Sequence, residues 1–137
     1  MAMTGGCLCG KVRYQVESDP LMCMTCHCKN CQRQSGSSLS IIVGVPKDAV
    51  KIDGVEHLKT YHDTGDSGAG VDRQFCGECG SPVFTVVEQR PEMLFIKAGT
   101  LDDTSSLNPA FHIFTKSKQE WVDLGDIPCF EAGPEGI

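Results

Sequence analysis

Three cysteines within six consecutive residues constrain this chain more than any other feature of its sequence. Cys26, Cys28 and Cys31 stand in the segment Cys-His-Cys-Lys-Asn-Cys, and few places in a small fold can bury three neighbouring thiols as ordinary core residues. Thiolates are good ligands for soft metal ions and bind Zn²⁺ at about 2.3 Å. Structural zinc sites close with four protein ligands, whereas catalytic sites commonly use three and keep one position free. The segment therefore predicts a zinc site with an open position.

The number of ligands by itself leaves other interpretations of this cluster open. A fourth protein ligand, such as Cys23 or a histidine, would close the site and make it structural. The thiols could instead form a metal-free redox cluster in which Cys23 is the resolving partner. His27 lies inside the segment, where it is either a proton shuttle or a side chain that points to solvent. We favour the open zinc site.

Four further cysteines stand in two pairs that are far apart in the chain. Cys7 and Cys9 alternate in Gly-Cys-Leu-Cys-Gly, so in a strand both would point to one face. Cys76 and Cys79 flank a tight turn in a Cys-x-x-Cys-Gly knuckle. Together the pairs predict a closed Cys₄ structural zinc that ties the first strand to a hairpin in the middle of the chain. Metal-binding energy would then be folding energy.

Composition bears on the compartment and on the partners. Nine cysteines are an odd number, and the start of the chain has no basic and apolar leader, so the set favours metal over disulfides and suggests the cytoplasm. The net charge of −6 without a Lys/Arg cluster argues against nucleic acid as a partner. No apolar run approaches the roughly 18 residues of a membrane helix. The 137 residues suit a single domain with its core at about 4–130, and Cys23 and Cys129 are expected to be buried, inert thiols.

Alternating and β-branched segments predict a mostly β fold. Val12, Tyr14 and Val16 alternate with polar residues and should form the buried face of an early strand. Further strands are expected within 37–46, 50–52, 57–61, 71–75, 82–87, 93–99 and 110–114. Residues 23–34 should be a loop with at most a single helical turn, and the Gly-rich stretch 63–70 an exposed loop.

The order of these motifs resembles the glutathione-dependent formaldehyde-activating enzyme family, also called the centromere protein V type. The matching motifs are Gly-Cys-Leu-Cys-Gly at 6–10, Cys-His-Cys-x-x-Cys at 26–31, Phe-Cys-x-x-Cys-Gly-Ser-Pro at 75–82, Gly-Thr-Leu-Asp-Asp at 99–103 and His-Ile-Phe-x-x-Ser-Lys-x-x-Trp at 112–121. The resemblance runs from about Thr4 to Phe130. The ordered series is specific, although no single motif would be.

The resemblance implies a β-tent of small antiparallel sheets joined by a structural zinc. It assigns that zinc to Cys7, Cys9, Cys76 and Cys79. It assigns a second, catalytic or labile zinc to Cys26, Cys28 and Cys31. The activity implied is addition of the glutathione thiol to formaldehyde, giving S-hydroxymethylglutathione, which is a carbon–sulfur lyase reaction in reverse and serves formaldehyde detoxification.

The leading hypothesis is a zinc-dependent carbon–sulfur lyase that acts on thiol–aldehyde adducts. A substrate thiol would take the open position of the three-cysteine site, lose its proton and attack the aldehyde carbon. Lys29 and Arg33 flank the cluster and are candidates for contact with a substrate carboxylate. Two rival hypotheses are a non-catalytic zinc-binding module that docks a protein partner through a sheet face, and a redox-sensing thiol cluster.

Overall fold

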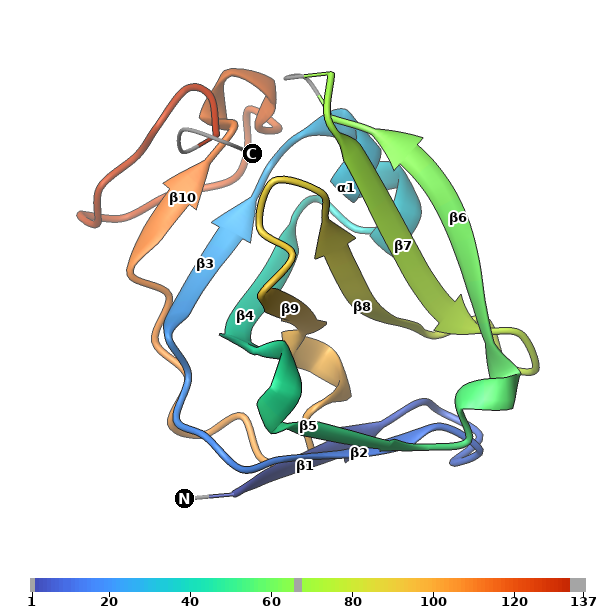
Figure 1. The fold of residues 1–137 in the computed structure, drawn as a ribbon. Coiled ribbons are helices and arrows are strands. Elements are labelled where there is room, and N and C mark those ends of the chain that lie inside the picture. The colour runs from blue at the N-terminus through green and yellow to red at the C-terminus, as the bar shows by residue number, and fades with distance from the viewer. Residues whose placement is uncertain (1, 66–67, 134–137) are drawn as a thin grey trace.

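Strands dominate the computed structural model, which describes residues 2–65 and 68–133 (Figure 1). The strands are β1 (Met3–Gly6), β2 (Arg13–Val16), β3 (Met22–Cys26), β4 (Ser40–Pro46), β5 (Val50–Asp53), β6 (Leu58–Thr64), β7 (Gly70–Cys76), β8 (Pro82–Val87), β9 (Met93–Lys97) and β10 (Phe111–Ile113). The α-helix in this part of the chain is α1 (Lys29–Ser35), and short 3-10 turns occur at Lys47–Ala49, Val55–His57, Ala98–Thr100 and Thr115–Ser117. The prediction of a mostly β chain is confirmed.

The smaller sheet has three antiparallel strands in the order β1-β2-β5. Its inner face carries the alternating residues that the sequence singled out, and Val12, Tyr14 and Val16 are all buried. Polar contacts join this sheet to the segment after β9. The Arg13 guanidinium donates to Asp102 at 3.0 Å, and the hydroxyls of Tyr14 and Thr100 lie 2.7 Å apart. The sheet is therefore attached to the rest of the fold at both its polar and its apolar face.

The larger sheet has seven strands in the order β10-β3-β4-β9-β8-β7-β6. Its pairings are antiparallel except for that of β10 with β3, which is parallel. The expectation of small antiparallel sheets is therefore wrong for this sheet. A strand from late in the chain can join β3 in parallel because the long connection after β9 brings it back to the far edge (Figure 1).

The two faces of the larger sheet have different neighbours. Cys23, Val43, Ile96 and Phe84 form one row across four strands and pack into the cluster that includes the inner face of the smaller sheet. The rings of Tyr14 and Phe84 meet edge to face at 5.2 Å between these layers. The opposite face carries a second apolar cluster, made up of Met24, Cys26, Cys31, Val87, Met93, Phe95, Ile113 and Phe114. The second face lies beside α1 and positions the candidate site.

Three local predictions are wrong in instructive ways. Cys7 and Cys9 lie in a turn after β1 rather than in a strand, because the Cys7 N–H donates to Val12 and closes a loop. Residues 23–34 contain most of β3 and most of α1 rather than a loop. The predicted exposed loop 63–70 is partly strand, since β6 runs to Thr64 and β7 begins at Gly70. Its residues 66–67 lie outside the described part.

The longest α-helix in residues 2–65 and 68–133 is the seven-residue α1, and no helix there is long and apolar enough to cross a membrane.

Candidate functional site

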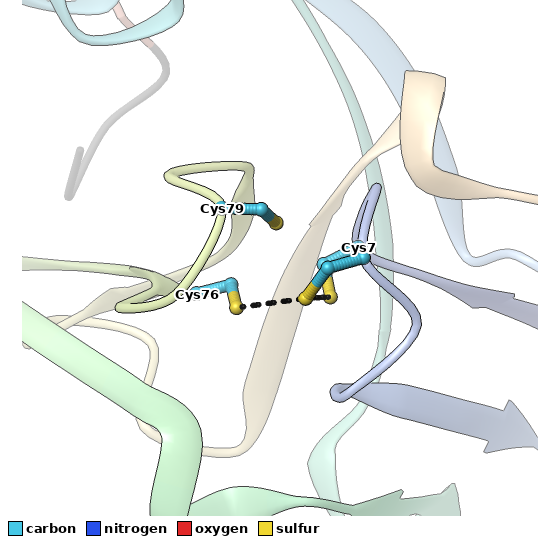
Figure 2. Close-up of side chains that lie close together, drawn as sticks. Cys7, Cys76 and Cys79 are labelled. Atoms are coloured by element: carbon cyan, nitrogen blue, oxygen red, sulfur yellow. Dashed lines mark hydrogen bonds between the residues drawn. The ribbon is translucent and has the colours of Figure 1, made fainter.

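The first candidate metal centre brings together four cysteines from two turns. Their Sγ atoms all lie within 4.8 Å of one another, and the group consists of Cys7, Cys9, Cys76 and Cys79. Figure 2 shows Cys7 facing Cys76 and Cys79 across the gap between the turn after β1 and the β7–β8 turn. The Sγ atom of Cys9 lies 3.6 Å from that of Cys7 and 3.8 Å from that of Cys76. Four thiolates placed tetrahedrally about 2.3 Å from a zinc ion would be about 3.8 Å apart, so the donor set fits zinc.

Backbone amides in both turns support ionised thiols. The Val12 N–H donates to Cys7 Sγ at 3.3 Å, and the Glu78 N–H donates to Cys76 Sγ at 3.4 Å. The Ser81 hydroxyl, 3.3 Å from Cys79 Sγ, is the main cause that lowers the pKa of Cys79 to about 5. Hydrogen bonds to a thiolate favour the charged form that a metal ion requires. These hydrogen bonds favour ionised thiols at Cys7, Cys76 and Cys79, and the group of four could hold a metal ion.

The second candidate centre consists of Cys26, Cys28 and Cys31, whose Sγ atoms also lie within 4.8 Å of one another. Cys26 is the last residue of β3, Cys28 is the N-cap of α1, and Cys31 lies in the first turn of that helix. The Cys31 N–H donates to Cys28 Sγ at 3.2 Å, which is the hydrogen bond of a side-chain N-cap. The strand end and the helix start thus bring three thiols together over a span of six residues.

No fourth cysteine, histidine or carboxylate in 2–65 and 68–133 joins this group of three. Cys23, one predicted candidate for closing the site, lies in the apolar cluster on the opposite face of the larger sheet. The predicted partition of seven cysteines into a group of four and a group of three is what the structure shows. Both groups could hold a metal ion, and that the ion is zinc stays a prediction.

His27 is fully buried, so the interpretation that it points to solvent is wrong. Its Nε2 lies 3.1 Å from the Thr25 hydroxyl, which also contacts Nδ1 of His112. His112 Nε2 donates to the carbonyl oxygen of Leu124 at 2.9 Å, so the Thr25 hydroxyl donates to His112 and accepts from His27. His27 Nδ1 is then a buried lone pair without a partner in the described structure. Burial lowers the pKa of His27, and a proton-shuttle role stays a prediction.

Two buried cations lie close to the three-cysteine group. Arg73 on β7 donates from Nε to Asp63 at 2.8 Å, and its terminal NH1 nitrogen lies 3.7 Å from Cys31 Sγ. Lys97 at the end of β9 donates from Nζ to the Ser40 hydroxyl at 2.7 Å. The neighbouring thiols of Cys26 and Cys28, followed by these two cations, lower the pKa of the Cys31 thiol. The site therefore favours a negative charge at Cys31, whereas hydrogen bonds to the neighbouring thiols and burial raise the pKa of Cys26.

A cavity of about 200 Å³ adjoins the three thiols on the same face of the larger sheet. Its walls include Cys26, Cys28, Cys31, Arg73, Thr85, Lys97 and the apolar side chains Met24, Ile42, Val71, Val87, Phe95, Ile113 and Phe114. Register explains why they share one face: Arg73 pairs with Thr85 on β8, and Thr85 pairs with Phe95 on β9. Lys29 and Asn30 also line the cavity and are exposed, so it opens beside the start of α1.

Sequence reasoning missed Arg73, Lys97 and Thr85. It named Lys29 and Arg33 as candidate cations, of which Lys29 lines the cavity and Arg33 does not. A signal for Lys97 was present, because this charged residue ends the strand Met93–Lys97, whose other residues are apolar and whose residues are all buried. A charged residue within such a run is rarely buried without a partner or a role. Cys129, predicted to be buried, is exposed.

Comparisons with known proteins concern the family and the fold of the chain. The family model for "Glutathione-dependent formaldehyde-activating enzyme" matches residues 2–117. A protein of Halomonas elongata described as "Putative glutathione-dependent formaldehyde-activating enzyme" is 27% identical over 142 residues, covering 98% of this chain and 90% of the relative. A crystal structure of a Rhodobacter sphaeroides protein has a similar fold, with a TM-score of 0.61 and 23% identity over 93% of this chain and 99% of that one.

Proposed function

The chain belongs to the glutathione-dependent formaldehyde-activating enzyme family, and on that premise we propose that it is a zinc-dependent carbon–sulfur lyase acting on thiol–aldehyde adducts. Glutathione and formaldehyde are the reactants that the family name suggests. In this proposal Cys7, Cys9, Cys76 and Cys79 hold a structural zinc. The catalytic centre is the group of Cys26, Cys28 and Cys31.

The single observation that carries the proposal is the association of three thiols with a cavity. The three Sγ atoms stand together without a fourth ligand among the described residues, and they form part of the cavity wall. A purely structural metal site would have no need of either feature. The same observation weighs against a simple docking module, because the cysteines line a cavity rather than a flat sheet face.

The residues around the cavity have separate tasks in this mechanism. Zinc bound by the three cysteines would supply a deprotonated substrate thiol at neutral pH. Arg73 and Lys97 place positive charge beside the sulfur atoms, which opposes the excess negative charge of a three-thiolate centre. Asp63 holds Arg73 in position through the hydrogen bond to Nε. The apolar walls exclude water from the reacting atoms, so these charges act in a medium of low dielectric constant.

The substitution Cys28→Ser offers a sharp test. Cys28 is half-buried at the N-cap of α1, where serine is a preferred residue, so the fold should tolerate the change while the centre loses one thiolate. We expect ¹³C-formaldehyde to exchange with glutathione faster in the presence of the native protein than without it, as measured by NMR. Cys28→Ser should return the exchange to the uncatalysed rate and lower the zinc content from two ions per chain to one. The exposed Cys129→Ser is the matched control and should change neither quantity.

Exchange that is no faster with native protein than without it would refute glutathione and formaldehyde as the reactants. Cobalt substitution then distinguishes the rivals. An open centre should change its visible spectrum when a small thiol is added, whereas a closed centre in a docking module should not. A redox-sensing cluster would instead release its metal on mild oxidation and rebind it on reduction.

A further inference from the structure

The cavity beside the three thiols is larger and more apolar than formaldehyde requires. Formaldehyde has two heavy atoms and no apolar body, whereas the cavity encloses about 200 Å³. Its walls include Met24, Val87, Phe95 and Ile113, each of which is almost completely buried. An enclosed cavity of about 150 Å³ lined by Leu, Ile and Phe takes up benzene, which gives a scale for the apolar part of this cavity. The volume therefore suits an apolar group of about six to eight heavy atoms.

One polar atom in the wall lacks a partner. Thr85 is 8% exposed, lines the cavity, and its Oγ1 has no hydrogen-bond partner in the described structure. An unpaired buried hydroxyl destabilises a fold, so its presence points to a ligand that completes it. Thr85 lies directly opposite Arg73 on the neighbouring strand, and Arg73 contacts Cys31. Thr85 and Arg73 therefore line the cavity side by side.

Apolar side chains form much of the wall, Arg73 and Lys97 add positive charge, and Thr85 adds a hydroxyl without a partner, a combination that suits a carbonyl compound with an apolar body. We propose that the carbonyl substrate of this protein is an apolar aldehyde larger than formaldehyde, whose oxygen accepts a hydrogen bond from Thr85 Oγ1. Its hydrocarbon part occupies the space between Met24, Val87, Phe95 and Ile113. This inference rests on the proposed function, because it concerns the second reactant at the same three-cysteine centre.

The reaction balances without an additional reagent. The substrate thiol gives up its proton, and a sulfur lone pair forms a C–S bond with the carbonyl carbon. The π electrons of the C=O bond move to oxygen, which takes a proton back to give a hemithioacetal. Thr85 donates to that oxygen throughout, and the positive charges of Arg73 and Lys97 lie on the same face of the sheet, where negative charge develops. The reverse sequence releases thiol and aldehyde.

Binding of unreactive amides tests the ligand class separately from catalysis. Isobutyramide imitates a branched aldehyde, and formamide imitates formaldehyde without its apolar body. By ligand-observed NMR with the native zinc-loaded protein, isobutyramide should bind at least about tenfold more tightly than formamide, because each enclosed methylene contributes about fourfold. Equal affinity for the two amides would overturn the inference.

Thr85→Val removes the hydroxyl and keeps the shape of the side chain. It should weaken isobutyramide binding about tenfold, since one hydrogen bond is lost, while the midpoint of thermal unfolding stays the same or rises. A purely structural threonine would show the opposite pattern, with lower stability and unchanged binding, and that result would refute the role of Thr85. Thr60→Val on the exposed edge strand β6 is the matched control and should leave amide binding unchanged.

Initial rates with a constant thiol separate the inference from the proposed function. The value of kcat/KM should rise from formaldehyde to isobutyraldehyde and fall about tenfold in Thr85→Val. Catalysis with formaldehyde but no gain with larger aldehydes would overturn the inference and leave the lyase proposal standing. Preferential binding of isobutyramide without acceleration of any aldehyde would refute the lyase proposal and support the ligand class of the cavity.

Discussion

The four-cysteine group leads to a prediction about stability that can be worked out from its position. Cys76 is fully buried at the end of β7, and its partners Cys7 and Cys9 come from the turn that precedes β2. A metal ion there would connect the smaller sheet to the larger one, at the end where the Gly77 N–H also donates to His57 in the connection between β5 and β6. Replacing Cys76 by serine removes one thiolate, and the remaining three cannot close the tetrahedron.

The expected loss of stability follows from comparing the free energy of zinc binding with the free energy of unfolding. Structural zinc contributes about 10–16 kcal/mol of apparent binding free energy, and small domains have net unfolding free energies of about 5–15 kcal/mol. Loss of the ion should therefore remove most or all of the stability of the fold. The buried hydroxyl that Cys76→Ser introduces would by itself lower the unfolding free energy by only about 1–3 kcal/mol, which is the cost of an unpaired polar group.

The buried Cys23 allows the two contributions to be separated, because it lies in the apolar core outside both cysteine groups. Cys23→Ser should lower the melting temperature moderately in calorimetry and leave the zinc content unchanged. Cys76→Ser should lose one zinc per chain and its cooperative unfolding transition, and a strong chelator should do the same to the native protein. A zinc-free Cys76→Ser protein that melts at the temperature of Cys23→Ser would refute this reasoning.

Three other predictions concern charge, pH and backbone geometry. Arg73→Gln removes a cation beside Cys31, so the three-cysteine group should need a higher pH for half-maximal metal binding in competition with a chelator; an unchanged midpoint would argue against the role of Arg73. Burial raises the pKa of Tyr14 to about 12 from 10.0, so stability should be complete below pH 10 and fall as the pH rises toward 12. Tyr14→Phe should abolish that decline in urea unfolding, and persistence of the decline would contradict the assignment. A Cβ at Gly54, where φ is 83°, would overlap the Lys11 carbonyl oxygen. Gly54→Ala should therefore lower the free energy of unfolding by well over the roughly 1–2 kcal/mol expected for a left-handed residue in open space. Gly125→Ala, at φ 65° with no neighbour, supplies that reference, and equal urea midpoints would disprove the overlap.

Much of the fold could be predicted because its signals are local. The alternation of Val12, Tyr14 and Val16 placed them on a buried face, and strand β8 was predicted with its observed bounds, 82–87. Errors arose where a short polar segment adopts a structure that depends on distant partners. Residues 22–26 form a strand because β4 and β10 pair with both of their edges, and neither pairing is visible in the local composition.

The candidate site likewise has a part that local sequence signals predicted and a part that depends on distant residues. Ligand chemistry identified the seven clustered cysteines, because thiols at short spacing have few other uses, and the partition into four and three required only counting. Arg73, Lys97 and Thr85 could not be found in this way. Each is a polar residue within a strand, and its relevance depends on what lies next to it across the cavity.

By itself the sequence determined the kind of chemistry available to this protein, since the identity and spacing of its thiols restrict which ions it can bind and how many ligands each receives. Only the tertiary structure decided what surrounds the three-cysteine centre. Strand register in the larger sheet places Thr85 opposite Arg73, and the packing of α1 beside that face places Cys31 next to the Arg73 cation and the apolar space. Register within the β7–β8 hairpin follows from its turn and its alternation of apolar residues, but the contact between Arg73 and Cys31 joins residues that are distant in the chain, and no local pattern carries that information.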